Sequence, residues 1–330
     1  MNARRDLTAA ALPREGHMPA LDGATEWLNS SPLTADGLRG RVVVIDFWTF
    51  TCINWLRTLP YVRAWAHEYE PDGLVVIGVH TPEFGIEADI DRVRRAAKEM
   101  RVSYPIAIDN DYAIWEAFAN HYWPALYFVD AAGEIRHHQF GEGDYERSED
   151  IIQVLLADGG ARDVRGTRAP VDAQGIEVEA DWANVESPET YVGYGRAERF
   201  ASPERVAYDE RSEYSVPAKL RRNQWALGGN WTIEQDAAVS RTANARIVYR
   251  FHARDLHLIL RSATPAHFRV RIDGEAPGTD HGLDVNADGS GIVTEARLYQ
   301  LVRQQRAIVD RLFEIEFTEP GAEAYAFTFG

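Results

Sequence analysis

The segment from residue 42 to residue 60, VVVIDFWTFTCINWLRTLP, constrains the fold of this chain more than any other stretch. It opens with an almost uninterrupted run of β-branched, aliphatic and aromatic residues over 42–48, which is typical of a strand buried on both faces. An apolar-periodic helix is expected directly after Cys52. The sequence therefore predicts that Cys52 lies where a buried strand ends and a helix begins.

This position favours the thiolate form of a cysteine, because unpaired backbone N–H groups and the positive end of the helix dipole point at the sulfur. The pKa of Cys52 is expected to fall from ~8.5 to ~7, which raises the thiolate fraction at neutral pH from a few per cent to about half. The alternative is a buried cysteine that acts only as a small hydrophobic residue. Cys52 is thus a candidate catalytic nucleophile.

Several features of this region resemble the active site of thioredoxin-like proteins of the redoxin/TlpA family. Asp46 stands six residues before Cys52, Pro60 lies where the family kinks its active-site helix, and Trp123-Pro124 matches the family's cis-proline. The resemblance implies an α/β thioredoxin-like fold and a buried carboxylate at Asp46. It also implies that Trp123 and Pro124 shape a groove beside Cys52 in which substrate backbone binds.

The chain departs from the family motif Cys-x-x-Cys, because residues 52–55 read CINW and the chain contains 1 Cys. Dithiol enzymes release their product when the second cysteine resolves the mixed disulfide, so this chain would need an external thiol. Trp55 lies on the same helical face as Cys52 and is expected either to shield the sulfur or to form an apolar wall for a substrate. Asp46, with no cation beside it, is expected to be a structural remnant with a raised pKa. Thr51 completes the predicted active-site environment.

Strands and helices alternate in the first half of the chain. We predict a flexible tail over residues 1–16, a thioredoxin-like redoxin domain over 17–160 and a linker over 161–188. A lead-in hairpin over 27–33 is expected to cover the first strand. The other predicted elements are strands at 74–79 and 106–108, helices at 86–100, 112–120 and 148–156, and a hairpin of 125–129 and 135–140 around a turn at 130–133.

The second half alternates apolar and charged residues with a period of two, which indicates half-buried antiparallel strands and a β-sandwich over residues 189–330. The segments NQWAL (223–227), RFHARDL (250–256), LYQL (298–301) and YAFTFG (325–330) resemble the C-terminal domain of DipZ-type proteins. In that family a redoxin domain precedes a jelly-roll domain similar to carbohydrate-binding modules. The resemblance thus implies an all-β jelly-roll sandwich after the thioredoxin-like domain.

Two features of the second half have a structural and a functional interpretation. Trp225 and Trp231 are of a type that stacks on sugar rings, but sandwich domains bury tryptophan routinely, so we predict core packing. Residues 284–295, beginning at Asp284 and ending at Glu295, have the spacing of a calcium loop. Because the flanking helices are missing and the same residues suit a tight hairpin, we predict a turn there and no metal site.

Charge and hydropathy exclude some classes of function. The formal net charge of -16 is opposite to that of a general nucleic-acid binder. No run of 18 apolar residues is present, so no membrane span or membrane partner is expected. The first residues lack the pattern of a secretory signal and a single cysteine gives no disulfide framework, so a cytoplasmic location is expected.

Two hypotheses of function follow. The first is a thiol-dependent oxidoreductase that uses Cys52 as its single nucleophile, needs no cofactor, and has an external thiol or thiol reductase as its partner. The second is a redox-inactive thioredoxin-fold scaffold whose β-sandwich binds a glycan or a protein.

Overall fold

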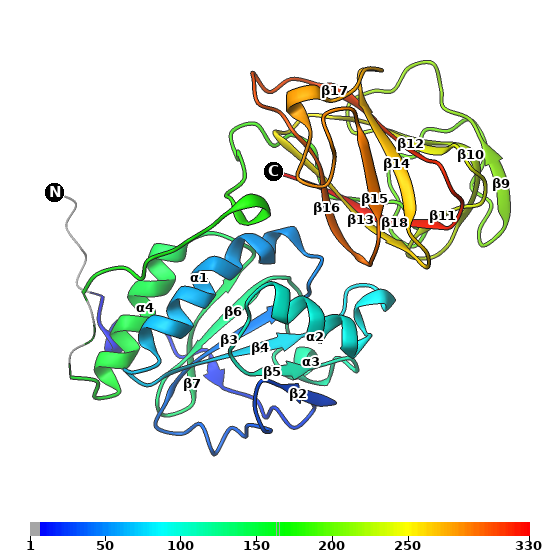
Figure 1. Ribbon diagram of the computed structural model, residues 1–330. Coiled ribbons are helices and arrows are strands. Elements are labelled where there is room, and N and C mark those ends of the chain that lie inside the picture. The colour runs from blue at the N-terminus through cyan, green and yellow to red at the C-terminus, as the bar shows by residue number, and fades with distance from the viewer. Residues whose placement is uncertain (1–6, 163, 165) are drawn as a thin grey trace. The chain divides into compact units, whose positions relative to one another are not determined.

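The computed structural model describes residues 7–162, 164 and 166–330. The chain divides into two compact units, Met1–Glu177 and Val178–Gly330. The first unit combines a sheet with helices and the second is built almost entirely of strands (Figure 1). No described helix has the length and apolar character that crossing a bilayer requires.

The first unit is a seven-stranded mixed sheet in the order β1-β7-β6-β3-β4-β5-β2. Its strands are β1 (Gly16–His17), β2 (Glu26–Leu28), β3 (Val42–Trp48), β4 (Leu74–His80), β5 (Ile106–Ile108), β6 (Ala125–Val129) and β7 (Glu134–Phe140). Its helices are η1 (Ala9–Ala11), α1 (Ile53–Tyr69), η2 (Gly85–Glu87), α2 (Ile90–Glu99), α3 (Ala113–Ala117), α4 (Tyr145–Asp158) and η3 (Gly175–Glu177).

The central strand β3 positions the candidate site. All of its residues are buried, as the apolar run predicts, and it pairs in parallel with β4 and antiparallel with β6. Phe47 packs edge-on against Trp115 of α3, whereas Trp48, on the opposite face of the sheet, stacks on Trp55 of α1. The thioredoxin-like fold predicted for this half is confirmed.

Local side-chain bonds explain where some elements begin and turn. Helix α2 begins at Ile90, later than predicted, because the Asp89 carboxylate caps it by accepting from the backbone N–H of Asp91 at 3.0 Å. In the β6–β7 turn, Asp130 Oδ1 accepts from the N–H groups of Ala132 and Glu134, which forms the predicted hairpin. The predicted lead-in hairpin is wrong: β2 pairs with β5 at the far edge of the sheet and does not cover β3.

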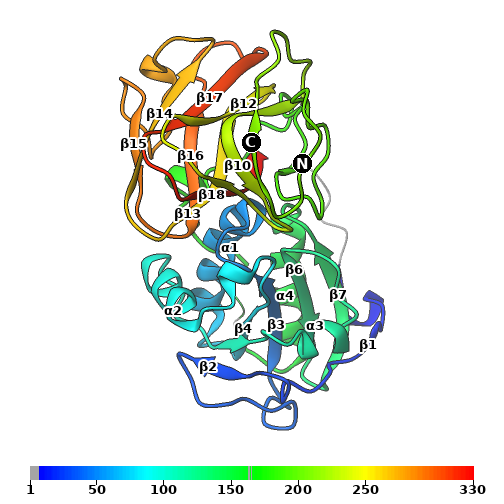
Figure 2. The ribbon, with the colours of Figure 1, turned by 90° about the vertical axis from the view of Figure 1, so that its right-hand side faces the viewer.

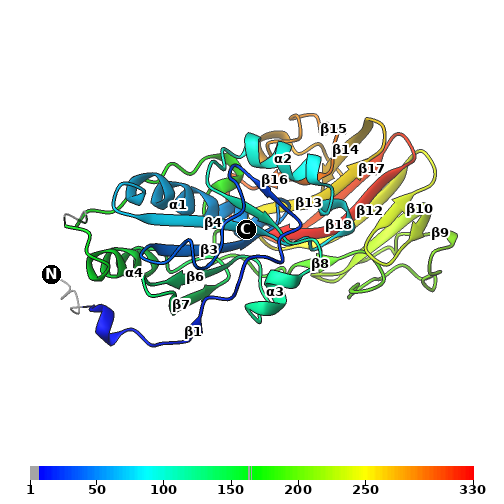
Figure 3. The ribbon, with the colours of Figure 1, turned by 90° about the horizontal axis from the view of Figure 1, so that it is seen from below.

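The N-terminal segment differs from the predicted flexible tail. Residues 1–6 lie outside the described residues, but the rest of that segment packs on β7, and β1 pairs with β7 at the edge of the sheet (Figure 3). The guanidinium of Arg136, which is 6% exposed, donates to the carbonyl oxygens of Ala9, Leu12 and Pro13. These bonds, which the sequence pattern did not reveal, attach the segment to the sheet.

The predicted linker, residues 161–188, is divided between the two units. Glu149 of α4 accepts from the Ala169 backbone N–H at 2.6 Å, and Glu177 of η3 pairs with Arg63 of α1 at 2.8 Å. Ala169 and Glu177 of the predicted linker are therefore bonded to the first unit, and the residues from Val178 onward belong to the second.

The second unit is a β-sandwich, as predicted (Figure 2). Its main path of strands runs β15-β14-β17-β12-β10-β11-β18-β13-β16, with β8 beside β18 and β9 beside β10. The elements are β8 (Thr190–Tyr191), β9 (Arg211–Tyr214), β10 (Trp225–Ile233), β11 (Ala238–Ser240), β12 (Ala245–Phe251), β13 (Asp255–Ser262), β14 (Ala266–Ile272), η4 (Gly278–Asp280), β15 (Ser290–Val293), β16 (Arg297–Arg303), β17 (Arg311–Phe317) and β18 (Ala322–Phe329).

Strand β10 joins the two layers of the sandwich. Its first half pairs with β12, and its second half pairs with β9 and β11. The change of partner falls at Gly228 and Gly229, and Gly229 has φ 89°, a left-handed conformation that glycine adopts without strain. Trp225 and Trp231, on either side of this pair, are both 0% exposed, which confirms core packing and excludes an exposed sugar-stacking face.

Candidate functional site

Cys52 is the N-cap residue of the seventeen-residue helix α1, directly after the β3 strand and its short loop. Its side chain is partly exposed, and Sγ donates to the carbonyl oxygen of Trp123 at 3.7 Å. The Trp123–Pro124 peptide bond is cis. The structure therefore brings together the cysteine, the tryptophan and the proline that the sequence assigns to one groove, with the sulfur at the positive end of α1.

Trp55 points away from this groove and into the core. Its indole is 0% exposed, stacks on Trp48 with ring centroids 4.3 Å apart, and donates from Nε1 to Asp46 Oδ2 at 3.1 Å. The interpretation of Trp55 as an open apolar wall for a substrate is wrong, because a completely buried ring offers no surface to a ligand. Its indole N–H is instead bound to the buried carboxyl that the family places near its second cysteine.

Asp46 is completely buried between β4 and β6, and the hydroxyl of Tyr104 also donates to its Oδ2, at 3.2 Å. Burial raises the pKa of Asp46 from 3.8 to about 7, against the opposing effect of the bonds from Trp55 and Tyr104. This agrees with the raised pKa expected from the sequence. Both donors bind Oδ2, while Oδ1 has no hydrogen-bond partner among the described residues.

Thr51, the residue before Cys52, reaches a carboxylate that the sequence analysis missed. Its hydroxyl donates to Oε1 of Glu87, which is 0% exposed, and Glu87 Oε2 accepts from the backbone N–H groups of Glu83 and Phe84. Burial raises the pKa of Glu87. The sequence gives little sign of this role, because Glu87 lies among other acids in a short loop.

His80, at the end of β4, was also missed. Its imidazole packs edge-on against Trp48, with ring centroids 4.8 Å apart, and is stacked on Phe50. Burial lowers the pKa of His80 to about 3, so the ring stays neutral at physiological pH. A neutral imidazole beside the active-site loop stabilises no charge, and we assign His80 to the core.

The loop that resembles a calcium site is a turn held by protein contacts. Asp284 pairs with Arg297 at 2.7 Å and accepts from the backbone N–H of Gln300, while Asp288 accepts from Ser290. These bonds engage both carboxylate oxygens of Asp284 and one of Asp288, which supports the turn. Within residues 7–162, 164 and 166–330 no cluster of three or more His, Cys, Asp or Glu side chains has the arrangement of a metal site.

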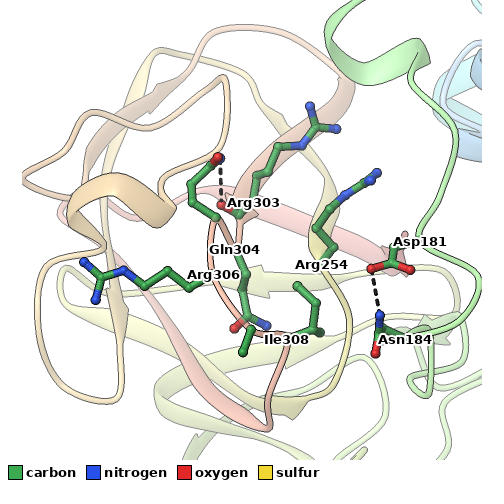
Figure 4. Close-up of a pocket in the computed structure, with 9 residues that line it drawn as sticks. Asp181, Asn184, Arg254, Arg303, Gln304, Arg306 and Ile308 are labelled. Carbon is green, nitrogen blue, oxygen red and sulfur yellow. Dashed lines mark hydrogen bonds between the residues drawn. The ribbon is translucent and has the colours of Figure 1, made fainter.

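The second unit contains a hollow of about 490 Å³ lined by three arginines, Arg254, Arg303 and Arg306 (Figure 4). Arg254 and Arg303 extend to one side of it and Arg306 to the other. The first two share one buried carboxylate, Asp255, at 2.7 and 2.6 Å. Among the described residues that line the hollow, Asp181 is acidic. The three arginines thus stand against the two carboxylates of Asp181 and Asp255, a local excess of positive charge in a chain of net charge -16.

A cysteine at the N-cap of the helix after a central buried strand, facing a cis proline, defines the thioredoxin-like class. Comparison with known proteins agrees. The AhpC/TSA family profile matches residues 18–138, and the thioredoxin-like C-terminal domain profile matches residues 187–330.

Individual proteins are similar to this chain over different lengths. Protein DipZ of Mycobacterium tuberculosis is 39% identical over 256 residues, which are 76% of this chain and 36% of DipZ. The thiol-disulfide oxidoreductase YkuV of Bacillus subtilis is 31% identical over 141 residues, which are 43% of this chain and 95% of YkuV. A solution structure of a thioredoxin-like protein in its oxidized form is 33% identical, covers 44% of this chain and 97% of its own, and has a TM-score of 0.41.

The chain belongs to the redoxin family of thioredoxin-like proteins, which includes thiol-disulfide oxidoreductases, and its redoxin domain precedes a thioredoxin-like C-terminal domain. It spans about a third of the length of the DipZ proteins that it matches.

Proposed function

We propose that this protein is a thiol-dependent oxidoreductase that uses Cys52 as its single nucleophile and an external thiol to complete the cycle. The observation that carries the proposal is the position of Cys52: a partly exposed residue at the N-terminus of α1, with Sγ 3.7 Å from the Trp123 carbonyl oxygen that precedes the cis proline. The helix N-terminus favours the thiolate, and the partial exposure of Cys52 supports its reaction with an external disulfide.

The reaction has two exchange steps. The Cys52 thiolate attacks one sulfur of a substrate disulfide, a new S–S bond joins Cys52 to that half of the substrate, and the other half leaves as a thiolate. The thiolate of an external thiol then attacks the substrate sulfur of this mixed disulfide. Cys52 leaves as a thiolate, and the substrate half is released as a disulfide with the external thiol.

The geometry around Trp55 supports the need for an external thiol. In a dithiol enzyme the residue three positions after the nucleophile carries the resolving sulfur, but here that position holds a buried indole bonded to Asp46. Asp46 is therefore bonded to an N–H group in place of a thiol, and we propose that it stabilises the fold and takes no part in the exchange.

The test is single-turnover and steady-state exchange with a peptide disulfide. Without an external thiol, the protein should release one thiol per chain and gain the mass of one peptide half on Cys52. Addition of a small-molecule thiol should give continuous turnover. The Cys52→Ser variant should do neither. A folded wild-type protein that forms no adduct would contradict the proposal.

As a second function we propose that the arginine-lined hollow of the β-sandwich binds an acidic ligand, such as a glycan with carboxylate groups. The local positive charge of Arg254, Arg303 and Arg306 favours it. The test is titration of the full chain with glucuronate and, separately, glucose, followed by NMR. Glucuronate should bind more tightly, and Arg306→Ala should weaken it, whereas Arg205→Ala, a change of an exposed arginine elsewhere in the unit, should not. Equal or absent binding of the two sugars would contradict it.

A further inference from the structure

A single loop, residues 81–87 between β4 and α2, is bonded to both sides of the Cys52 groove. On the cysteine side, the buried Glu87 carboxylate accepts from the hydroxyl of Thr51. On the proline side, the carbonyl oxygen of Thr81 accepts from Trp123 Nε1 at 3.0 Å. The loop thus connects the residue before the nucleophile to the residue before the cis proline.

The loop is itself fixed at both ends. Thr81 donates from its backbone N–H to the Trp48 carbonyl oxygen at 3.1 Å and from its hydroxyl to Asp109 Oδ2 at 3.1 Å. At the other end, Glu87 Oε2 accepts from the backbone N–H groups of Glu83 at 2.7 Å and of Phe84 at 3.0 Å. Because these bonds hold the loop to itself and to β3, the Glu87 carboxylate has a fixed position. The Thr51 hydroxyl that is bonded to it is therefore held in place as well.

From this arrangement we infer that Glu87 is a positioning residue for the nucleophile: through Thr51 it holds the Cys52 sulfur at the N-terminus of α1. The inference rests on the proposed function of Cys52. Glu87 acts through Thr51 and is not itself a reacting group.

The physical reason lies in the short range of the helix-terminus effect. Stabilisation of a thiolate by the end of a helix falls off within the first turn, so a small displacement of Cys52 weakens it. A hydrogen bond from a hydroxyl to a buried carboxylate is one of the stronger protein hydrogen bonds, and it joins the residue next to Cys52 to a fixed loop. Loss of this bond should therefore raise the pKa of the Cys52 thiol toward that of an ordinary cysteine.

The test is the rate of Cys52 alkylation by iodoacetamide as a function of pH in full-length variants. Thr51→Val removes the hydroxyl and keeps the shape of the side chain, whereas Thr51→Ser keeps the hydroxyl. Thr51→Val should move the pH midpoint upward and reduce the rate at pH 7 by about threefold or more, while the rate at high pH is unchanged. Thr51→Ser should behave as the wild type, which a merely structural effect on folding would not predict.

Glu87→Gln provides a second variant, because one amide oxygen can accept from Thr51 or from the Glu83 and Phe84 N–H groups but not from both sides. It should shift the midpoint in the same direction. The matched control is Glu99→Gln, the same change at an exposed position at the end of α2, which should have no effect.

The outcomes separate this inference from the proposed function. A low wild-type midpoint that Thr51→Val and Glu87→Gln leave unchanged would overturn the positioning role and leave the oxidoreductase proposal standing. An ordinary wild-type midpoint of about 8.5 that the variants do not alter would overturn both. Near-ultraviolet circular dichroism of each variant establishes that the compared proteins are folded.

Discussion

Replacement of Asp46 by asparagine tests the interpretation of this carboxyl as a buried, structural group. Asparagine has nearly the shape of the protonated acid. Its oxygen can accept from Trp55 and Tyr104 as Asp46 Oδ2 does, and its NH₂ group takes the place of Oδ1. Asp46→Asn should therefore resemble the protein in which Asp46 is protonated, at every pH.

The expected size follows from the pKa shift. Asp46 titrates near pH 3.8 as an ordinary aspartate and at about 7 in the folded protein. Between these values the folded state keeps a proton that the unfolded state has lost, so the free energy of unfolding falls as pH rises through this window and is level above it. A difference of about three pKa units corresponds to roughly 4 kcal/mol, at 1.36 kcal/mol per unit.

The assay is urea unfolding of both proteins between pH 4 and pH 8.5. The slope of the unfolding free energy against urea concentration is compared as well, because equal slopes mean that a shift of the midpoint reports a change in stability. The Asp46→Asn variant should be about as stable as the wild type near pH 4. It should become more stable by an amount that grows to the order of 4 kcal/mol near pH 8. A stability difference that does not depend on pH would refute the raised pKa and with it the structural assignment of Asp46.

Three further predictions concern other parts of the chain. Trp55→Cys should reduce one substrate disulfide per chain to two free thiols without an external thiol, because the new cysteine resolves the mixed disulfide and is left in a disulfide with Cys52; Trp55→Phe should stop at the mixed disulfide. Trp55→Cys should also lower the free energy of unfolding by about 3–5 kcal/mol because it leaves a cavity under α1, and failure of the folded variant to form this disulfide would contradict the assigned geometry. Asp284→Ala should destabilise the protein by about 1–3 kcal/mol in thermal unfolding because Arg297 loses its partner, while millimolar Ca²⁺ should leave the wild-type melting temperature unchanged. Gly229→Ala should cost about 1–2 kcal/mol, measured by urea unfolding, because its φ of 89° is unfavourable for any residue with a Cβ.

Local patterns predicted much of the first unit because its key elements are determined by short-range chemistry. The apolar run of β3 is typical of a strand with both faces buried, as it is in the structure. Asp130 forms its turn with residues two and four positions away. The alternating pattern of the second half likewise required strands with one face in a core. These features are visible without knowledge of long-range contacts.

The features that the sequence did not reveal depend on partners far away in the chain. Arg136 attaches the N-terminal segment through backbone carbonyl groups more than 120 positions away, and the buried Glu87 is bonded to Thr51, 36 positions earlier. The residues next to Glu87 in the sequence do not indicate that its carboxylate is buried. The direction of the Trp55 ring was equally undetermined, since the same helical face adjoins both the groove and the core.

The thiolate character of Cys52 is tested most directly by the pH dependence of its alkylation in the folded wild-type protein, with the urea-unfolded chain as reference. We expect a midpoint below pH 8 for the folded protein and about 8.5 for the unfolded chain. A folded-state midpoint at or above that of the unfolded chain, or a sulfur that reacts only after unfolding, would contradict it.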